Sequence, residues 1–251
     1  MLIYFAGAEN LTHKTSLVEH RVKNVLCSAW GFNEYRKKME GYEDFDNILM
    51  DSGGYTARIQ GIDVDVNAYA NFLNVNDIKL AFNLDVLDEK TSDYNQKFLE
   101  KETSAYIIPV YHYSDYNSKK HRHMIDKMIE EYPYISLGGI AGMGLGTKKE
   151  IFYDYVFKKI ANKWDKCKIH GLGITSKKVL SMYPFYSVDS ISWLSFQVHG
   201  QSRTIKNKLL VKFHNKETHY LKRNSWEIEY YKDMEKYITE LWDKRGVSWN
   251  E

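Results

Sequence analysis

The sequence predicts an α/β protein of the (β/α)8 barrel class, and three observations lead to that prediction. Short apolar runs that close on a polar residue or a glycine recur along the chain, at residues 48–51, 80–85, 106–113, 134–142, 168–173 and 185–190. Polar segments with helical spacing separate these runs. The chain of 251 residues, with 43% hydrophobic content, is long enough for one barrel-sized domain. Repeated strand–helix units imply parallel strands with right-handed crossovers, and closure into a barrel accounts for them better than an open sheet does.

The first strands are expected at residues 2–8 and 24–30, and the third ends in the motif Asp-Ser-Gly-Gly-Tyr at residues 51–55. An apolar run bounded by glycines is typical of a buried parallel strand, which here delivers Asp51 to its C-terminal end. Taken alone, Asp51 followed by Ser52 is also typical of a turn or a helix cap. The recurrence of the same pattern in later strands favours a functional carboxylate.

Helices are expected between the strands, at residues 66–73, 91–104 and 118–132. A capping box at residues 147–150 predicts the start of another helix, because Thr147 can accept from an amide of the first turn while Glu150 reaches back. Ser176 is expected to cap a short helix that ends at Met182.

The glycines at positions 142, 144 and 146 leave an open doubly wound sheet as a second architecture. Glycines between a strand and a helix can mark a dinucleotide site. Their spacing here differs from that fingerprint, and no acid closes a following strand at the required distance. These glycines can instead bind an anion through backbone amides, or form a loop without a ligand.

The overall composition bounds the partners and the compartment. A formal charge of +2, from 35 basic and 33 acidic residues, gives no global field, so binding to a polyanion must come from local clustering. The two cysteines, Cys27 and Cys167, exclude a disulfide scaffold and suit a reducing compartment. Residues 1–10 have no basic start and too short an apolar run for a signal peptide or a membrane span. We therefore predict a soluble cytoplasmic protein with no membrane partner.

A local basic cluster lies between residues 201 and 223, where Glu217 is the single acid among seven basic residues. The basic residues are Arg203, Lys206, Lys208, Lys212, Lys216, Lys222 and Arg223. Aromatic residues between them indicate a hairpin that could follow a phosphate backbone and stack bases. Such a run of charge can also be a solvated face.

After this cluster, Ser225 is expected to cap a long helix that packs on the barrel. The apolar stripe of this helix consists of Tyr230, Met234, Ile238, Leu241 and Trp242. We therefore predict a catalytic barrel of residues 1–200, followed at residues 201–251 by the basic hairpin and this helix.

Several short motifs occur in a fixed order along the chain. They are DSGGY at residues 51–55, LD at 84–85, SLGG at 136–139, HGLG at 170–173 and SVDSISW at 187–193. In this order they resemble the tRNA-guanine transglycosylases, and more closely their short relatives that insert 7-deazaguanine bases into DNA. The resemblance covers residues 48–193 and implies a (β/α)8 barrel, with site residues at the C-terminal strand ends.

The resemblance also implies the chemistry. Exchange of one purine for another at C1′ needs a carboxylate that captures the sugar and an acid/base that serves the leaving and incoming bases. Asp189 is implied as the nucleophile, Asp51 as the acid/base and Asp85 as the reader of the purine edge. Tyr55 and His170 would sandwich the base. The implied base-binding set is Asp85, Tyr55, Gly138, Gly139, His170 and His112, and the implied substrates are DNA and a 7-deazaguanine base, with no cofactor.

The sequence departs from the tRNA enzymes in two respects. Their strand carries two acids three residues apart, the second being the nucleophile, whereas here the second position is Ser192 and Asp189 alone remains. Successive strand residues alternate faces, so Asp189 and Ser192 cannot point the same way in a regular strand. Two cysteines also cannot form the zinc subdomain of the tRNA enzymes, which favours DNA as the partner and leaves tRNA as the alternative.

Two interpretations from other classes stay open. His112, His170, Asp189 and His199 near strand ends allow a metal-dependent hydrolase, although the sequence has neither H-x-H nor H-E-x-x-H spacing. The change to Ser192 allows an inactive barrel that serves as a nucleic-acid-binding or partner subunit. Under the main interpretation no metal is needed, and the oligomeric state stays unknown.

Overall fold

The structure is a computed structural model. It describes residues 1–86, 88–139, 147–161, 163, 166–194, 201–206, 209–214 and 220–249, and within these ranges the backbone alone of residues 147 and 201–224. The chain divides into two compact units. The first, here called the N-terminal unit, is Ala6–Val110. The second, the C-terminal unit, combines Met1–Phe5 with Tyr111–Glu251.

Strands alternate with helices throughout the N-terminal unit. Its elements are α1 (Leu11–Glu19), β2 (Asn24–Ser28), η1 (Ala29–Gly31), β3 (Asn47–Asp51), α2 (Gly54–Ile59), α3 (Val66–Val75), β4 (Leu80–Phe82), α4 (Glu89–Glu102) and β5 (Tyr106–Ile108). Asn10, Asp65 and Asp88 stand just before α1, α3 and α4. The side chain of each accepts a backbone N–H from the first turn that follows, which fixes where these helices begin.

The C-terminal unit takes in β1 (Leu2–Ala6) and resumes at β6 (Val110–His112). Its other elements are α5 (Tyr113–Asn117), α6 (Met124–Glu131), β7 (Tyr134–Gly138), α7 (Thr147–Ile160), β8 (Lys168–Gly171), α8 (Lys177–Met182), β9 (Ser187–Ser190), η2 (Ser192–Leu194), β10 (Gln201–Lys206), β11 (Leu209–His214) and α10 (Tyr220–Asp243). The predicted helix start at Thr147 is confirmed. Ser176 stands at the N-cap of α8 as predicted, but its side chain makes no capping hydrogen bond.

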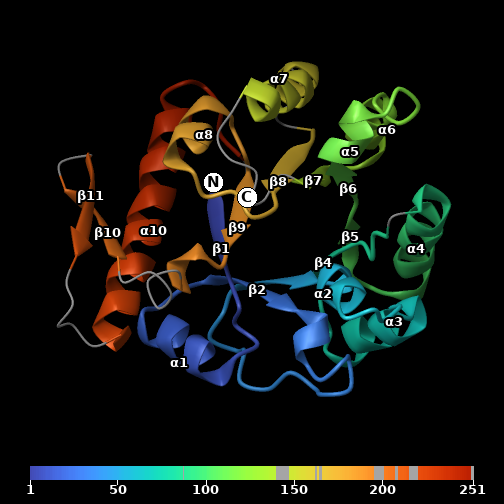
Figure 1. The fold of residues 1–251 in the computed structure, drawn as a ribbon, viewed down its shortest axis with the longest axis horizontal. Helices are drawn as coiled ribbons and strands as arrows, with labels where there is room; N and C mark the ends of the chain where they lie inside the picture. The colour runs from blue at the N-terminus through green and yellow to red at the C-terminus, as the bar shows by residue number, and fades with distance from the viewer. Residues whose placement is uncertain are drawn as a thin grey trace. The chain divides into compact units, whose positions relative to one another are not determined.

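The strands β1 to β9 form one sheet in the order β5-β4-β3-β2-β1-β9-β8-β7-β6. The pairs β1–β9, β2–β3, β3–β4, β4–β5, β7–β8 and β8–β9 are all parallel. Parallel neighbours need long crossover connections, and helices lie in most of the connections between successive strands (Figure 1). The α/β fold of the (β/α)8 barrel type that the sequence predicts is therefore confirmed.

The strands of the C-terminal unit lie in its core. Both β7 and β9 are buried along their whole length, although three of the four residues of β9 are polar. Helix α10 packs Tyr231 against Phe5 of β1, with ring centroids 6.1 Å apart, and Phe5 also contacts Trp193 at 6.0 Å. The predicted stripe is thus largely confirmed: Tyr230, Met234, Ile238 and Trp242 are buried and Leu241 is half-buried.

Two predicted elements differ from the structure. The single strand expected at residues 106–113 is two strands, because Pro109 has no N–H to give to the ladder and separates β5 from β6. The helix expected at residues 118–132 is shorter, because Ser118 has an extended backbone that ends α5, and α6 begins again only at Met124.

The C-terminal segment forms the predicted antiparallel hairpin, in which Arg203 lies opposite Lys212. The expected helix start at Ser225 is wrong, because α10 begins at Tyr220. Tyr-Leu-Lys-Arg at residues 220–223 contains no glycine or proline that would delay a helix. Lys222 and Arg223 therefore lie on α10 and not on the hairpin, while Lys208 and Lys216 fall outside the described residues. The predicted boundary at residue 200 stays a prediction.

Candidate active site

The centre of the candidate site is built by two neighbouring strands of the C-terminal unit. Ser187 and Asp189 are two residues apart on β9, so their side chains point to the same side of the sheet. On β8, His170 is the register partner of Ser187. The His170 imidazole therefore lies beside both side chains, with Ser187 toward the start of β9 and Asp189 toward its end.

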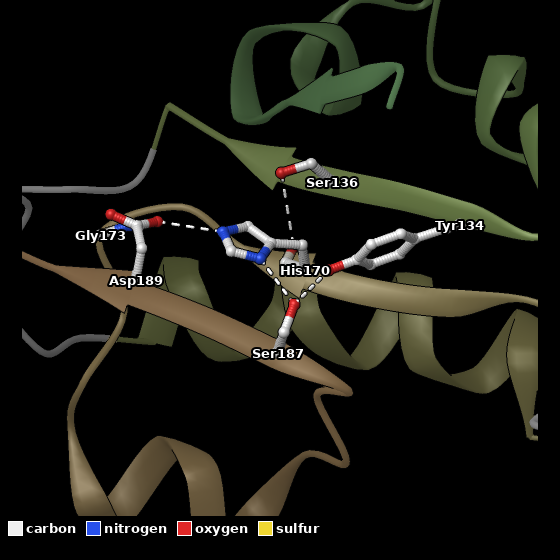
Figure 2. Close-up of polar contacts among 6 residues, drawn as sticks. All are labelled: Tyr134, Ser136, His170, Gly173, Ser187 and Asp189. Carbon is white, nitrogen blue, oxygen red and sulfur yellow. Dashed lines mark hydrogen bonds and ion pairs between the residues drawn. The ribbon is translucent and has the colours of Figure 1, made fainter. Parts of the chain in front are cut away.

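Hydrogen bonds engage both nitrogens of the His170 ring (Figure 2). Nδ1 lies 2.6 Å from Oγ of Ser187, and Nε2 lies 3.0 Å from Oδ1 of Asp189. The Ser187 hydroxyl also contacts the hydroxyl of Tyr134 on β7. Burial raises the pKa of Tyr134 well above its usual value, so this phenol stays protonated. The result is a continuous polar chain from Tyr134 to Asp189.

Asp189 is the end of this chain that solvent reaches. Its side chain is 12% exposed, whereas that of His170 is 0% exposed. The backbone N–H of Gly173, in the turn after β8, donates to the same oxygen Oδ1 at 2.9 Å. Among the described residues, no hydrogen bond reaches the other oxygen, Oδ2. Asp189 thus holds one carboxylate oxygen in place and leaves the second available.

The set of Ser187, His170 and Asp189 has the composition of a hydrolytic triad but not its geometry. In such a triad the nucleophilic serine contacts Nε2 and the aspartate contacts Nδ1, which is the reverse of the contacts here. Ser187 is also 0% exposed, so a substrate cannot reach its Oγ. The arrangement presents a carboxylate, and not a serine, to the outside.

The expected stacking of a base on His170 meets a constraint in this structure. The ring is fully buried and lies edge-on to Tyr4, with centroids 6.1 Å apart. It has no exposed face for a base, so stacking would require the ring to leave both of its hydrogen bonds. The stacking role stays a prediction that this geometry does not favour.

Three predicted base-binding residues come together elsewhere in the C-terminal unit. Gly138 ends β7, and Gly139 follows with a positive φ of 74° that favours glycine. A Cβ on Gly139 would lie 3.4 Å from Nδ1 of His112, so the two residues are in contact range. The backbone N–H of His112 donates to Asp115 at 2.8 Å, which fixes the start of α5.

In the N-terminal unit, Asp51 is the last residue of β3 and accepts the backbone N–H of Gly53 at 2.9 Å. This contact closes a tight turn, in which Gly53 has a φ of 74°. Tyr35 supports the turn from outside by donating its hydroxyl to the carbonyl oxygen of Ser52 at 2.6 Å. Asp51 therefore stands at a strand end, as predicted, and also takes part in the turn that the same motif suggests.

The second acid of the N-terminal unit, Asp85, lies just beyond β4 and is half-buried. The two acid-bearing loops adjoin, because a Cβ on Gly54 would lie 3.7 Å from the carbonyl oxygen of Asp85. Tyr69 of α3 joins the ends of the two strands, with its hydroxyl 3.0 Å from the carbonyl oxygen of Phe82 and 3.4 Å from that of Met50. Burial raises the pKa of Tyr69 well above its usual value, and the charges of the two acids add to the effect.

Tyr55 completes the placement of the predicted residues. It is 69% exposed on α2, so its ring can accept a base, and the Arg58 guanidinium lies over the ring, 5.5 Å from its centre. Sequence reasoning missed Tyr35, Tyr69, Ser187 and Tyr134, which hold the acids in place. Ser187 could have been found from the spacing Ser-x-Asp, because residues two apart on a strand share a face. No sequence pattern pointed to the three tyrosines.

A metal-dependent hydrolase, the alternative that the sequence left open, would need a cluster of metal ligands. Within the described part of the chain, no three His, Cys, Asp or Glu side chains gather as a metal-ion site, and His199 lies outside it.

None of the described helices is both long enough and apolar enough to cross a bilayer. The chain matches no protein-family model and no curated protein. The inference to function therefore depends on the residues themselves.

Proposed function

We propose that the protein is a base-exchange transglycosylase that replaces guanine in DNA with a 7-deazaguanine derivative. The observation that supports this most directly is the carboxylate of Asp189. It lies at a strand end, its Oδ1 receives two hydrogen bonds, and its Oδ2 receives none among the described residues. A carboxylate that must attack a sugar carbon needs this combination of a fixed orientation and one oxygen free to form a bond.

In the first half-reaction, Oδ2 of Asp189 forms a bond to C1′ while the bond between C1′ and N9 of guanine breaks. The bonding electrons leave with the base, and a proton from the carboxylic acid of Asp51 neutralises it. The product is a covalent ester between Asp189 and the sugar, as in retaining glycosidases.

In the second half-reaction, the Asp51 carboxylate takes the N9 proton of the incoming 7-deazaguanine. N9 then bonds to C1′ and the ester bond to Oδ2 breaks, which restores Asp189. Protons and charges balance over the two steps, so no cofactor is consumed. Asp85 is proposed to accept from N–H groups on the purine edge, and Tyr55 to stack on its face.

DNA is proposed as the macromolecular substrate and tRNA as the alternative. The hairpin of β10 and β11 carries basic residues suited to phosphates, and the two cysteines cannot make a zinc subdomain. The target guanine must leave its stack before Asp189 can reach C1′, at a cost of a few kcal/mol. Both cysteines are free and buried, which fits the proposed cytoplasmic location.

A trapping experiment tests the proposal. Protein is incubated with a guanine-containing oligonucleotide, of DNA or of tRNA sequence, and a 7-deazaguanine base, and is then resolved on a denaturing gel. We expect a shifted covalent band with DNA that Asp189→Asn lacks. The matched control is Asp126→Asn, an exposed acid on α6 whose loss should leave the band intact. A band with tRNA alone would select the alternative substrate, and an undiminished band in Asp189→Asn would end the assignment of the nucleophile.

A further inference from the structure

A buried chain of hydrogen bonds lies behind the carboxylate of Asp189. It runs from the hydroxyl of Tyr134 to Oγ of Ser187, through the ring of His170, to Oδ1 of Asp189 (Figure 2). Ser187 and His170 are 0% exposed. The proposed reaction uses Asp189 but gives no task to the other three residues. Buried polar networks of this kind cost free energy unless every member is satisfied, so the network calls for an explanation.

The chemistry of the groups fixes the direction of the hydrogen bonds. An ionised Asp189 can only accept, so Nε2 of His170 must carry the proton that lies between them. In a neutral ring Nδ1 then has a lone pair and accepts from the hydroxyl of Ser187. The serine oxygen in turn accepts from Tyr134, whose burial keeps its proton in place. All three bonds then point toward the carboxylate and strengthen one another.

We infer that His170 is a positioning residue for Asp189, held as the neutral Nε2–H tautomer by Ser187 and Tyr134. The inference rests on the proposed function, because it gives His170 a task in presenting the nucleophile. His170 touches neither the sugar nor the base. It holds Oδ1 so that Oδ2 faces the sugar carbon.

A neutral ring has a specific advantage during the proposed reaction. When Oδ2 forms the ester, Asp189 loses its negative charge. A protonated His170 would then be an unpaired cation at a fully buried position, which is costly. A neutral Nε2–H ring can keep donating to the ester oxygen Oδ1 and carries no charge in either state. In this form Nδ1 can accept from Ser187, which in turn can accept from Tyr134, so each hydroxyl proton of the chain has an acceptor.

The first test reads the tautomer directly and does not depend on activity. In ¹⁵N-labelled protein at about pH 8, above the ordinary pKa of histidine, the ring nitrogens are observed by NMR. The chain has nine histidines, so the signal that disappears in His170→Gln assigns the residue. We expect a pyrrole-type Nε2 that carries hydrogen and a pyridine-type Nδ1. The opposite pattern would overturn the inference.

The second test uses two amides of different reach at the same position. The side-chain nitrogen of Gln can occupy the place of Nε2 and donate to Asp189, whereas Asn reaches only the place of Nδ1. For His170→Asn, we expect the single-turnover rate of covalent adduct formation to fall about 10- to 100-fold, the effect of one hydrogen bond to a charged group. DNA affinity should not change. His170→Gln should stay within a few-fold of the wild-type rate.

Two buried serines supply the matched control. Ser187 contacts the ring of His170, whereas Ser136 contacts its backbone carbonyl oxygen at 3.5 Å, and both are 0% exposed. Ser187→Ala should shift the Nδ1 resonance in the NMR spectrum, because that nitrogen loses its hydrogen-bond partner, and lower the rate. Ser136→Ala should do neither. Equal effects of the two changes would show that the chain is merely part of the core.

The outcomes separate the inference from the function on which it rests. If Asp189→Asn loses the adduct while His170→Asn keeps the wild-type rate, the function stands and the inference is wrong. If the wild-type protein forms no adduct with either nucleic acid, the function is wrong. In that case the tautomer in the NMR spectrum, and the response of the Nδ1 resonance to Ser187→Ala, still decide whether the chain orients the ring. If His170→Asn does not fold, the wild-type NMR spectrum and the comparison of Ser187→Ala with Ser136→Ala decide the question.

Discussion

The turn that presents Asp51 offers a sharp test of how the fold serves the site. Gly53 and Gly61 both belong to the N-terminal unit and have nearly the same left-handed backbone, with φ of 74° and 72°. Their surroundings differ. A Cβ on Gly53 would lie 2.3 Å from Cβ of Trp30 and 2.7 Å from Oγ of Ser28, whereas nothing lies within 4 Å of a Cβ on Gly61. Substitution by alanine therefore imposes the same backbone strain at both positions and a clash at one.

The structure sets the size of the two effects. Left-handed backbone costs an L-residue about 1–2 kcal/mol, so Gly61→Ala should lose that amount of unfolding free energy. Gly53→Ala should lose a further 1–3 kcal/mol, roughly the cost of an overpacked core. At about 2–4 °C per kcal/mol for a chain of this size, the Tm of Gly53→Ala should lie about 2–12 °C below that of Gly61→Ala.

Function should follow the same order. The N–H of Gly53 donates to Asp51, so a backbone shift forced by the new methyl group moves the proposed acid/base. Gly53→Ala should therefore lose base exchange in addition to stability, while Gly61→Ala keeps the wild-type rate below its melting transition. Thermal melts and exchange of labelled guanine into DNA measure the two quantities. Equal melting temperatures and equal exchange rates in the two variants would refute the reasoning.

Three further predictions concern the proposed acid, the hairpin and the thiols. The Asp51→Asn variant should fold and bind DNA, but its rate of base exchange should fall by about 10²-fold or more, the usual scale for a lost acid/base. A near-normal rate would show that Asp51 only stabilises the turn. Four lysines of the basic cluster at residues 201–223 are changed to Gln: Lys206, Lys208, Lys212 and Lys216. The change should flatten the log–log salt dependence of DNA binding by about 0.7–0.9 per lost phosphate contact, and an unchanged slope would mean that the nucleic acid binds elsewhere. Burial raises the pKa of the thiols of Cys27 and Cys167, that of Cys167 to about 12. A thiol reagent should therefore label the native protein slowly and the unfolded protein fast. Rapid labelling of the native protein would contradict the burial of the two thiols.

The order of strands and helices could be predicted because it is written in local patterns. Apolar runs closed by a polar residue or a glycine marked the strands, and the structure has a strand at each of them. Errors arose where one residue changed the local geometry. Pro109 split a run that reads as continuous, and Ser118 ended a helix through its own extended backbone. The start of α10 was placed too late because Ser225 is a good cap, yet the residues before it continue a helix equally well.

The candidate site was less accessible to sequence reasoning. Each predicted acid lies close to the C-terminal end of a strand, because that property follows from local sequence. The groups that hold the acids come from other elements. Tyr69 reaches the ends of β3 and β4 from a helix, and Tyr134 reaches Ser187 from another strand. Such contacts depend on register and crossover geometry, which periodicity in a single strand does not specify.

The position of Ser192 differs from the regular strand that the sequence suggested. The prediction treated Asp189 and Ser192 as members of one regular strand, on opposite faces. The strand in fact ends at Ser190, and η2 begins at Ser192. Oγ of Ser190 accepts the backbone N–H of Ser192 at 2.9 Å. Ser192 is therefore not on the strand face at all. Within β9 the side chain that shares the face of Asp189 is Ser187, and this serine engages His170. Under the proposed function, the neutral ring of His170 supports the carboxylate of Asp189 from behind, and a second acid on the same strand is not required.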